Sequence, residues 1–173
     1  MSEETGIIID KELLRQTANN IMESMGIKQE KQSHGGIELI NCPIGTYKSG
    51  QACLAMICGV SIKQIDEELG SRKDGVLLKT KDLVTILKLH KIRCEDSLRR
   101  VYTGWQGYTF MQNVIAIVRL NMKAEYLLDY CKYQPRYYWV LHYKRKVFDP
   151  YSSISEDFPS RTTSFLRVWP REK

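Results

Sequence analysis

The sequence predicts an α+β fold, because segments with helical periodicity fill its first half and segments with strand character fill its second half. Apolar residues recur at helical spacing before residue 90, whereas the apolar run Val114–Val118 and the aromatic segment Tyr137–Tyr143 are typical of strands. The chain has 173 residues, of which 43% are hydrophobic and 27% charged, which suits one buried core. We therefore expect helices packed on an antiparallel sheet.

The N-terminal segment, residues 1–35, is expected to be an extension of the main domain. A helix follows Asp10 there, since Asp is a favourable N-cap and apolar residues follow it at helical spacing. The polar stretch Lys28–Gly36 is expected to be a loop, and Ile37–Ile40 a short strand. Residues 36–173 are then expected to form the main domain.

Three more helices are expected before the strands begin. The first of them starts at the end of a polar loop, at Ser49, and is broken at Gly59. Ser61 predicts the start of the next helix, because Gln64 lies three residues later as in a capping box. The last helix of this half starts near Thr80.

The second half is expected to contain the sheet. Val114–Val118 is the most apolar run with high β-propensity and is expected to be the central strand. Tyr137–Tyr143 and Lys146–Phe148 are expected to form a hairpin around a turn at Lys144-Arg145. Ser164–Trp169 is expected to be the last strand. The connecting stretches expected to be loops are 71–75, 96–108 and 151–160.

The stretch from Tyr47 to Ser61 reads YKSGQACLAMICGVS. It resembles the loop-to-helix segment of papain-like cysteine peptidases, most closely their bacteriocin-processing-like branch. The family pattern is Cys-Gly-Gln or Pro-Ala-x-Leu-Ala-Met, followed by Gly-Val-Ser. The residues that match it are Gly50, Gln51, Ala52, Leu54, Ala55, Met56, Gly59, Val60 and Ser61. In this register the family's nucleophilic Cys falls on Ser49.

A second match lies in the predicted hairpin. The family has His-Trp-Val-Val on one strand and Tyr-Asp-Pro on the next, where this chain has Tyr138-Trp139-Val140-Leu141 and Phe148-Asp149-Pro150. The family's His therefore falls on Tyr138, and only Asp149 keeps its type. The resemblance covers roughly residues 36–169 and implies a papain-like fold, with a helical half packed on an antiparallel sheet and the site between them.

The two substitutions predict a loss of catalysis. A Ser hydroxyl stays protonated near neutral pH and needs a base, and Tyr, with a reference pKa of about 10, is a poor base there. We therefore expect a cysteine-peptidase-like pseudoenzyme that binds a peptide or protein segment in the old cleft.

An alternative is an active cysteine peptidase or deamidase with a displaced site. Its nucleophile would be Cys53, with His142 as the base and Asp149 as the orienting group. Asn41 is a candidate oxyanion donor, because its side-chain amide can donate hydrogen bonds. The simpler interpretation, which we favour, is that Cys53 is a buried core residue and His142 a polar strand residue.

A third hypothesis is nucleic-acid binding by segment 119–146, in which basic residues alternate with tyrosines. The competing interpretation is that these aromatic residues pack the sheet and the basic residues solvate its edge. The net charge of +6 and the pI of about 9.0 favour an acidic partner without identifying one.

The five cysteines have no paired short spacing, so neither a metal site nor a cofactor is expected. With no signal peptide and no long apolar run, we expect a cytoplasmic protein without a membrane partner.

Overall fold

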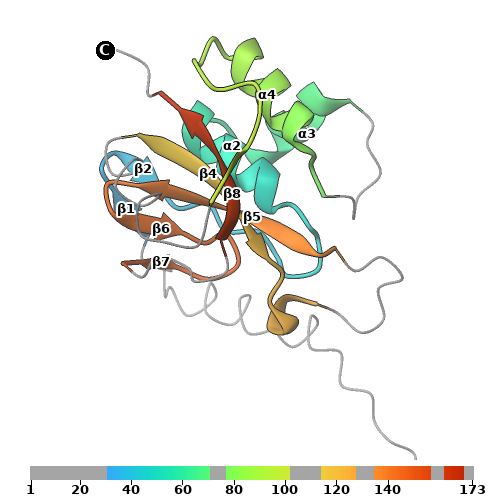
Figure 1. The fold of residues 1–173 in the computed structure, drawn as a ribbon, viewed down its shortest axis with the longest axis vertical. Helices are drawn as coiled ribbons and strands as arrows, with labels where there is room; N and C mark the ends of the chain where they lie inside the picture. The colour runs from blue at the N-terminus through green and yellow to red at the C-terminus, as the bar shows by residue number, and fades with distance from the viewer. Residues whose placement is uncertain (1–30, 71–76, 102–113, 128–134, 157–161, 170–173) are drawn as a thin grey trace, which may run out of the picture. The chain divides into compact units, whose positions relative to one another are not determined.

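The computed structural model describes residues 31–70, 77–101, 114–127, 135–156 and 162–169. The chain divides into two compact units, Met1–Lys31 and Gln32–Lys173, and the elements described here belong to the second unit (Figure 1). The helix predicted after Asp10 lies outside the described residues. The second unit begins slightly before the boundary expected at residue 36.

The helical elements of the second unit are α2 (Ser49–Cys58), α3 (Ile62–Leu69), α4 (Thr80–Leu89) and the short 3-10 helix η1 (Ala124–Tyr126). The strands are β1 (Ser33–His34), β2 (Ile37–Glu38), β3 (Arg99–Arg100), β4 (Ile115–Asn121), β5 (Tyr137–Tyr143), β6 (Lys146–Phe148), β7 (Ile154–Ser155) and β8 (Thr162–Val168).

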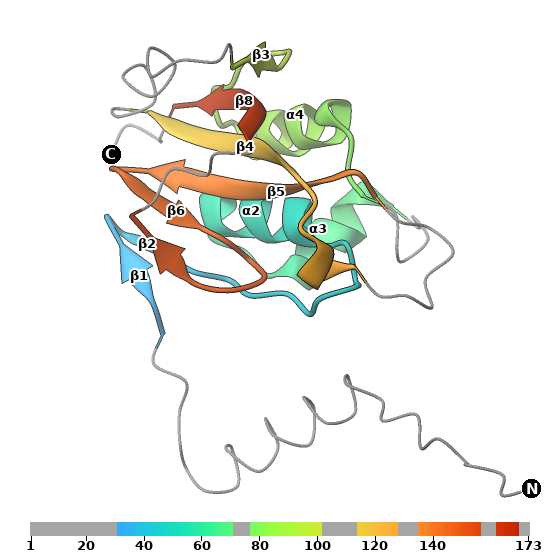
Figure 2. The same ribbon diagram turned by 60° about the horizontal axis from the view of Figure 1, so that its bottom comes forward.

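The main sheet has six strands in the order β3-β8-β4-β5-β6-β7, and all neighbouring strands are antiparallel. Strand β4 lies in its interior, as predicted for the apolar run. Helices α2, α3 and α4 lie on one side of this sheet (Figure 2). The predicted α+β class and the antiparallel sheet are therefore confirmed.

Alternation along the strands gives the sheet two buried faces. Ile117, Trp139 and Leu141 share one core cluster with residues of the three helices. Val118 and Tyr138 belong to a second cluster, which also contains residues from η1 and from the chain around Cys42, Ala52 and Tyr151. Because both faces are covered, residues 138 and 139 of β5 are both completely buried, although they point in opposite directions.

Helix α2 lies very close to the sheet and to the segment before α4. A Cβ atom at Gly50 would come within 3.0 Å of Cδ1 of Trp139 and 3.1 Å of Cβ of Leu78. A side chain there would displace one of these neighbours, so the Gly allows the first turn of α2 to approach β5. The helix ends at Gly59, which has a left-handed conformation with φ of 71°.

Helix α3 begins as predicted. The Oγ atom of Ser61 accepts a hydrogen bond from the backbone N–H of Gln64 at 3.1 Å, which satisfies one of the free N–H groups of the first turn.

The hairpin β5–β6 has the predicted turn. Lys144 and Arg145 have φ values of 47° and 64°, so both lie in the left-handed region, as a two-residue type I′ turn requires. The register pairs Leu141 with Phe148 and His142 with Val147. This register continues toward Asp149, which directly follows β6 and thus lies beside the middle of β5.

Three short strands fall in stretches that were expected to be loops. Strand β1 pairs with β2 through a turn at Gly35-Gly36, with φ values of 62° and 83°. Strands β3 and β7 each have two residues, at opposite edges of the main sheet. Two residues are too few for the alternation that reveals a strand in a sequence.

Candidate functional site

The family match points first to Ser49, which begins helix α2 and is completely buried. Its Oγ atom accepts a hydrogen bond from the backbone N–H of Trp139 on β5 at 3.1 Å. The indole Nε1 of Trp139 donates in turn to the carbonyl oxygen of Leu78 at 3.0 Å. The first bond joins the first turn of α2 to β5, and the second joins β5 to the segment before α4. The start of α2 and strand β5 therefore meet in space.

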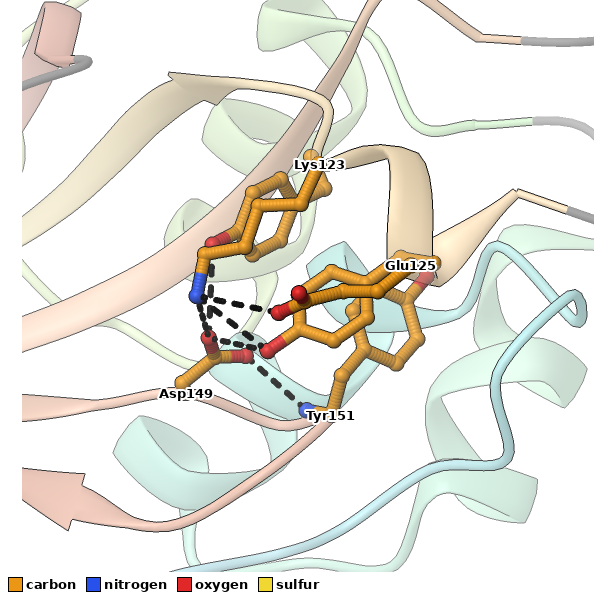
Figure 3. A network of polar contacts seen from close by, with 6 residues as sticks. Lys123, Glu125, Asp149 and Tyr151 are labelled. Atoms are coloured by element: carbon orange, nitrogen blue, oxygen red, sulfur yellow. Dashed lines mark hydrogen bonds and ion pairs between the residues drawn. The ribbon is translucent and has the colours of Figure 1, made fainter.

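The carboxylate of Asp149 is the centre of a polar network (Figure 3). Its Oδ2 atom accepts hydrogen bonds from the hydroxyl groups of Tyr126 at 3.0 Å and Tyr138 at 3.3 Å. The ammonium of Lys123 lies 3.6 Å from the same oxygen. The Oδ1 atom accepts the backbone N–H of Tyr151 at 3.0 Å. Both oxygens of this buried carboxylate are therefore satisfied by donors.

The electrostatics of the network keep its phenols protonated. Burial, followed by the negative charge of Asp149, raises the pKa of Tyr138 far above its ordinary value. Burial alone would lower the pKa of Lys123, but a hydrogen bond with Tyr126 and the charge of Asp149 hold it above its ordinary value. Lys123 therefore supplies a positive charge beside Asp149, whereas Tyr138 supplies a neutral donor.

The Tyr151 ring fills the space beside the first turn of α2. Burial raises the pKa of its hydroxyl, while Ser49 lowers it through hydrogen bonding from both its side chain and its backbone. The ring centroid of Tyr151 lies 5.7 Å from that of Tyr138 and 4.9 Å from that of Tyr126.

The candidate oxyanion donor, Asn41, has an exposed side chain. Its neighbour Cys42 is anchored to the strand end by a hydrogen bond from its N–H to the carbonyl oxygen of Pro150 at 2.9 Å. Asn41 therefore lies in the loop that passes beside Pro150, with its side chain exposed.

Sequence reasoning missed three members of this network: Lys123, Tyr126 and Tyr151. Tyr151 follows the Asp149-Pro150 motif directly, and this adjacency was a usable signal. Lys123 and Tyr126 come from η1, whose place beside Asp149 depends on how the chain returns from β4 to β5, and no local pattern indicates it.

The residues of the displaced alternative have environments that oppose catalysis. Burial, with the charges of Cys42 and Asp149, raises the pKa of the Cys53 thiol well above its ordinary value. Burial also lowers the pKa of His142 to about 4. A nucleophilic thiol needs the opposite shift, toward the thiolate. Cys53 is completely buried in the helix-side core cluster.

The aromatic residues of segment 119–146 are less available for stacking than the sequence suggests. Tyr126, Tyr138 and Trp139 are buried. Arg119 lies over the ring of Tyr137, with 5.1 Å from Cζ to the ring centroid, and Lys144 lies over Tyr143 at 5.2 Å. Tyr130, Lys132 and Tyr133 lie outside the described residues.

Within the described ranges, no group of three or more His, Cys, Asp or Glu side chains is arranged to hold a metal ion. The described helices include none with the length and apolar character needed to cross a membrane.

A search against models of protein families found no match for this chain, and a search of the curated proteins found none either.

Proposed function

We propose that this chain is a catalytically inactive relative of the papain-like cysteine peptidases and acts by binding a peptide or protein segment. The main support is that Ser49 is hydrogen-bonded to the backbone of Trp139, the residue after Tyr138, while the Tyr138 hydroxyl is hydrogen-bonded to Asp149. The sequence match assigns Ser49, Tyr138 and Asp149 to the nucleophile, base and orienting positions. Their nearness in space is what that assignment requires.

The same contacts argue against turnover. The Ser49 hydroxyl is completely buried and accepts a backbone hydrogen bond from Trp139. The Tyr138 hydroxyl donates to Asp149, and its raised pKa makes it the wrong group to remove a proton from Ser49. The groups at the nucleophile and base positions are therefore both engaged in structural contacts.

Binding is the function that such a scaffold retains. The α2–β5 junction keeps its close packing at Gly50 and its Trp139 anchor, so the framework of the site is intact while its reactive groups are replaced. Peptidase clefts hold extended segments, and we infer that the partner is a segment of this kind.

The first experiment restores the two substituted side chains. In Ser49→Cys with Tyr138→His, the introduced thiol should ionise at the N-terminus of α2 with the introduced imidazole as partner. We expect a lowered thiol pKa and fast alkylation in the double variant only, because the two groups act as a unit. The measurement is the alkylation rate at residue 49 against pH, resolved by peptide mass spectrometry from the five native cysteines.

The controls are the wild type and the two single variants. If the double variant folds but its introduced thiol titrates as a free Cys does, residues 49 and 138 are not the former catalytic positions. The proposed relationship would then be wrong.

The second experiment tests binding directly. A random peptide library displayed on phage should yield sequences that bind the wild type. Their synthetic versions should slow hydrogen exchange in the loop before α2 and in β5. Selected peptides that protect only distant segments would contradict binding at this site.

The displaced site of Cys53, His142 and Asp149 makes a different prediction, although burial and the charges of Cys42 and Asp149 raise the pKa of the Cys53 thiol. It predicts rapid iodoacetamide labelling of Cys53 in the native protein, lost in His142→Ala. Our proposal predicts slow labelling, since the thiol is completely buried.

A further inference from the structure

A second surface, away from Ser49, combines exposed positive charge with an aromatic ring. It follows the edge of the main sheet where the chain from Arg93 to Arg99 runs beside β8. Hydrogen bonds from Trp169 N to the carbonyl oxygen of Arg93 and from Glu95 N to that of Arg167, at 2.9 and 3.0 Å, hold the two segments together. We call Arg93, Arg99, Arg167 and Trp169 the arginine edge.

Two guanidinium groups stack on one indole in the arginine edge. The Cζ atom of Arg93 lies 4.7 Å from the centroid of the Trp169 ring, and that of Arg167 lies 5.5 Å from it. Arg93 is exposed and Trp169 is half-buried. A guanidinium held over an indole by a cation–π contact loses little further side-chain freedom when it binds a ligand.

The positive charge of the arginine edge is only partly neutralised. Glu95 uses its Oε1 atom to accept from Nε of Arg99 at 2.7 Å and from Nη2 of Arg167 at 2.6 Å. One carboxylate thus faces two guanidinium groups, and Arg93 adds a third positive charge above Trp169. The net charge of +6 on the whole chain would further attract a polyanion.

We propose that the arginine edge binds single-stranded nucleic acid. A guanidinium group offers a planar face to a base and N–H donors to a phosphate, and single strands use both features. A carboxylate of an acidic peptide would use only the N–H donors. The described aromatic residues of segment 119–146 are buried or lie beneath one cation each, whereas Trp169 lies beneath two guanidinium groups.

Charged side chains on an edge strand also prevent edge-to-edge association of sheets, and that role alone gives no affinity for nucleic acid. The experiment therefore measures binding of fluorescein-labelled dT20 and rU20 by anisotropy at several salt concentrations. We expect binding at low salt that weakens as salt is raised, because phosphate contacts release counterions.

Two substitutions at Arg93 separate stacking from charge. Arg93→Gln should weaken binding at least fivefold, and Arg93→Lys should restore the salt dependence but only part of the affinity. The control is Lys63→Gln on α3, which removes the same charge from a side chain that is 87% exposed and should change affinity less than twofold. Circular dichroism checks that each variant is folded.

Four results would overturn the proposal. The first is no binding of either oligonucleotide at low salt. The second is an equal effect of Arg93→Gln and Lys63→Gln. The third is displacement of the oligonucleotide by polyglutamate as effectively as by unlabelled dT20, which would assign the surface to acidic proteins. The fourth is equal binding of duplex DNA, which would remove the stacking role.

Discussion

At the scale of single residues, Asp149 is held by a network of structural contacts at a position that our proposal assigns to a former catalytic group. In the proposed ancestry its partner would have been an imidazole on β5. Here it accepts two phenol hydroxyls and one backbone N–H and lies 3.6 Å from the ammonium of Lys123. The positive charge beside it now comes from η1 rather than from β5. Such a network stabilises the chain only while every member is present.

Asp149→Asn should therefore destabilise the protein strongly. The amide replaces one acceptor oxygen with a donor that faces hydroxyl groups and an ammonium, and the network loses its buried carboxylate. We expect a loss of about 2–4 kcal/mol in the free energy of unfolding, measured by urea denaturation. The matched control is Asp96→Asn, which removes a surface partner of Lys88 and should cost less than about 1 kcal/mol. Equal effects would show that the Asp149 network contributes no more than a surface ion pair.

At the scale of elements, the β5–β6 hairpin decides where the site residues lie. Its two-residue turn sets the register that brings Asp149 beside β5, and a shift by one residue would turn Tyr138 to the opposite face. Nevertheless the turn is built from Lys144 and Arg145, which are not the residues preferred where φ is positive.

Replacing Arg145 by Gly should relieve this strain. Arg145 has φ of 64°, a conformation that Gly adopts without a Cβ clash. We expect Arg145→Gly to be more stable than Arg145→Ala by about 1 kcal/mol in thermal or urea unfolding, because both variants remove the same exposed side chain but only Gly removes the strain. If Ala proves equal to Gly, the turn adopts another conformation in solution.

At the scale of the whole molecule, the sequence indicated the fold class and most of the long elements, because the chemistry that determines them is local. Ser61 with Gln64 indicated the start of α3, and the apolar run indicated β4. The packing between residues that are far apart in the sequence was not predictable. Whether Tyr126 or Asn41 faces Asp149 depends on loop paths, and the sheet edges at β3 and β7 depend on pairing between distant segments. The helical and strand periodicity of the sequence carries no information about loop paths or about pairing between distant segments.

The stability of the whole molecule should depend on pH through His142. Its pKa is about 4 in the folded chain, because burial disfavours the charged ring, against about 6.5 for an unfolded chain. The unfolded state therefore binds the proton first as the pH falls. The contribution of His142 to the free energy of unfolding is therefore complete above about pH 6.5 and is lost as the pH falls toward about 4.

Between pH 7 and pH 5 the contribution of His142 should amount to about 2 kcal/mol. In His142→Leu the difference in unfolding free energy between these two pH values should be smaller by that amount, as measured by urea denaturation. An unchanged difference would mean that His142 has the same pKa in the folded and the unfolded chain.

The hydrogen bond from Trp139 to Leu78 holds one tryptophan in the core, so the intrinsic fluorescence of the protein can report on two places separately. Trp139 is completely shielded from water beside Ser49, whereas Trp169 is half-buried at the arginine edge. A soluble quencher such as acrylamide should therefore reach Trp169 and spare Trp139. The tryptophan fluorescence that remains in the presence of the quencher reports on the α2–β5 junction. The fluorescence that the quencher removes reports on the sheet edge. In a Trp105→Phe background, which leaves these two indoles, occupancy of either proposed surface becomes readable without an attached dye.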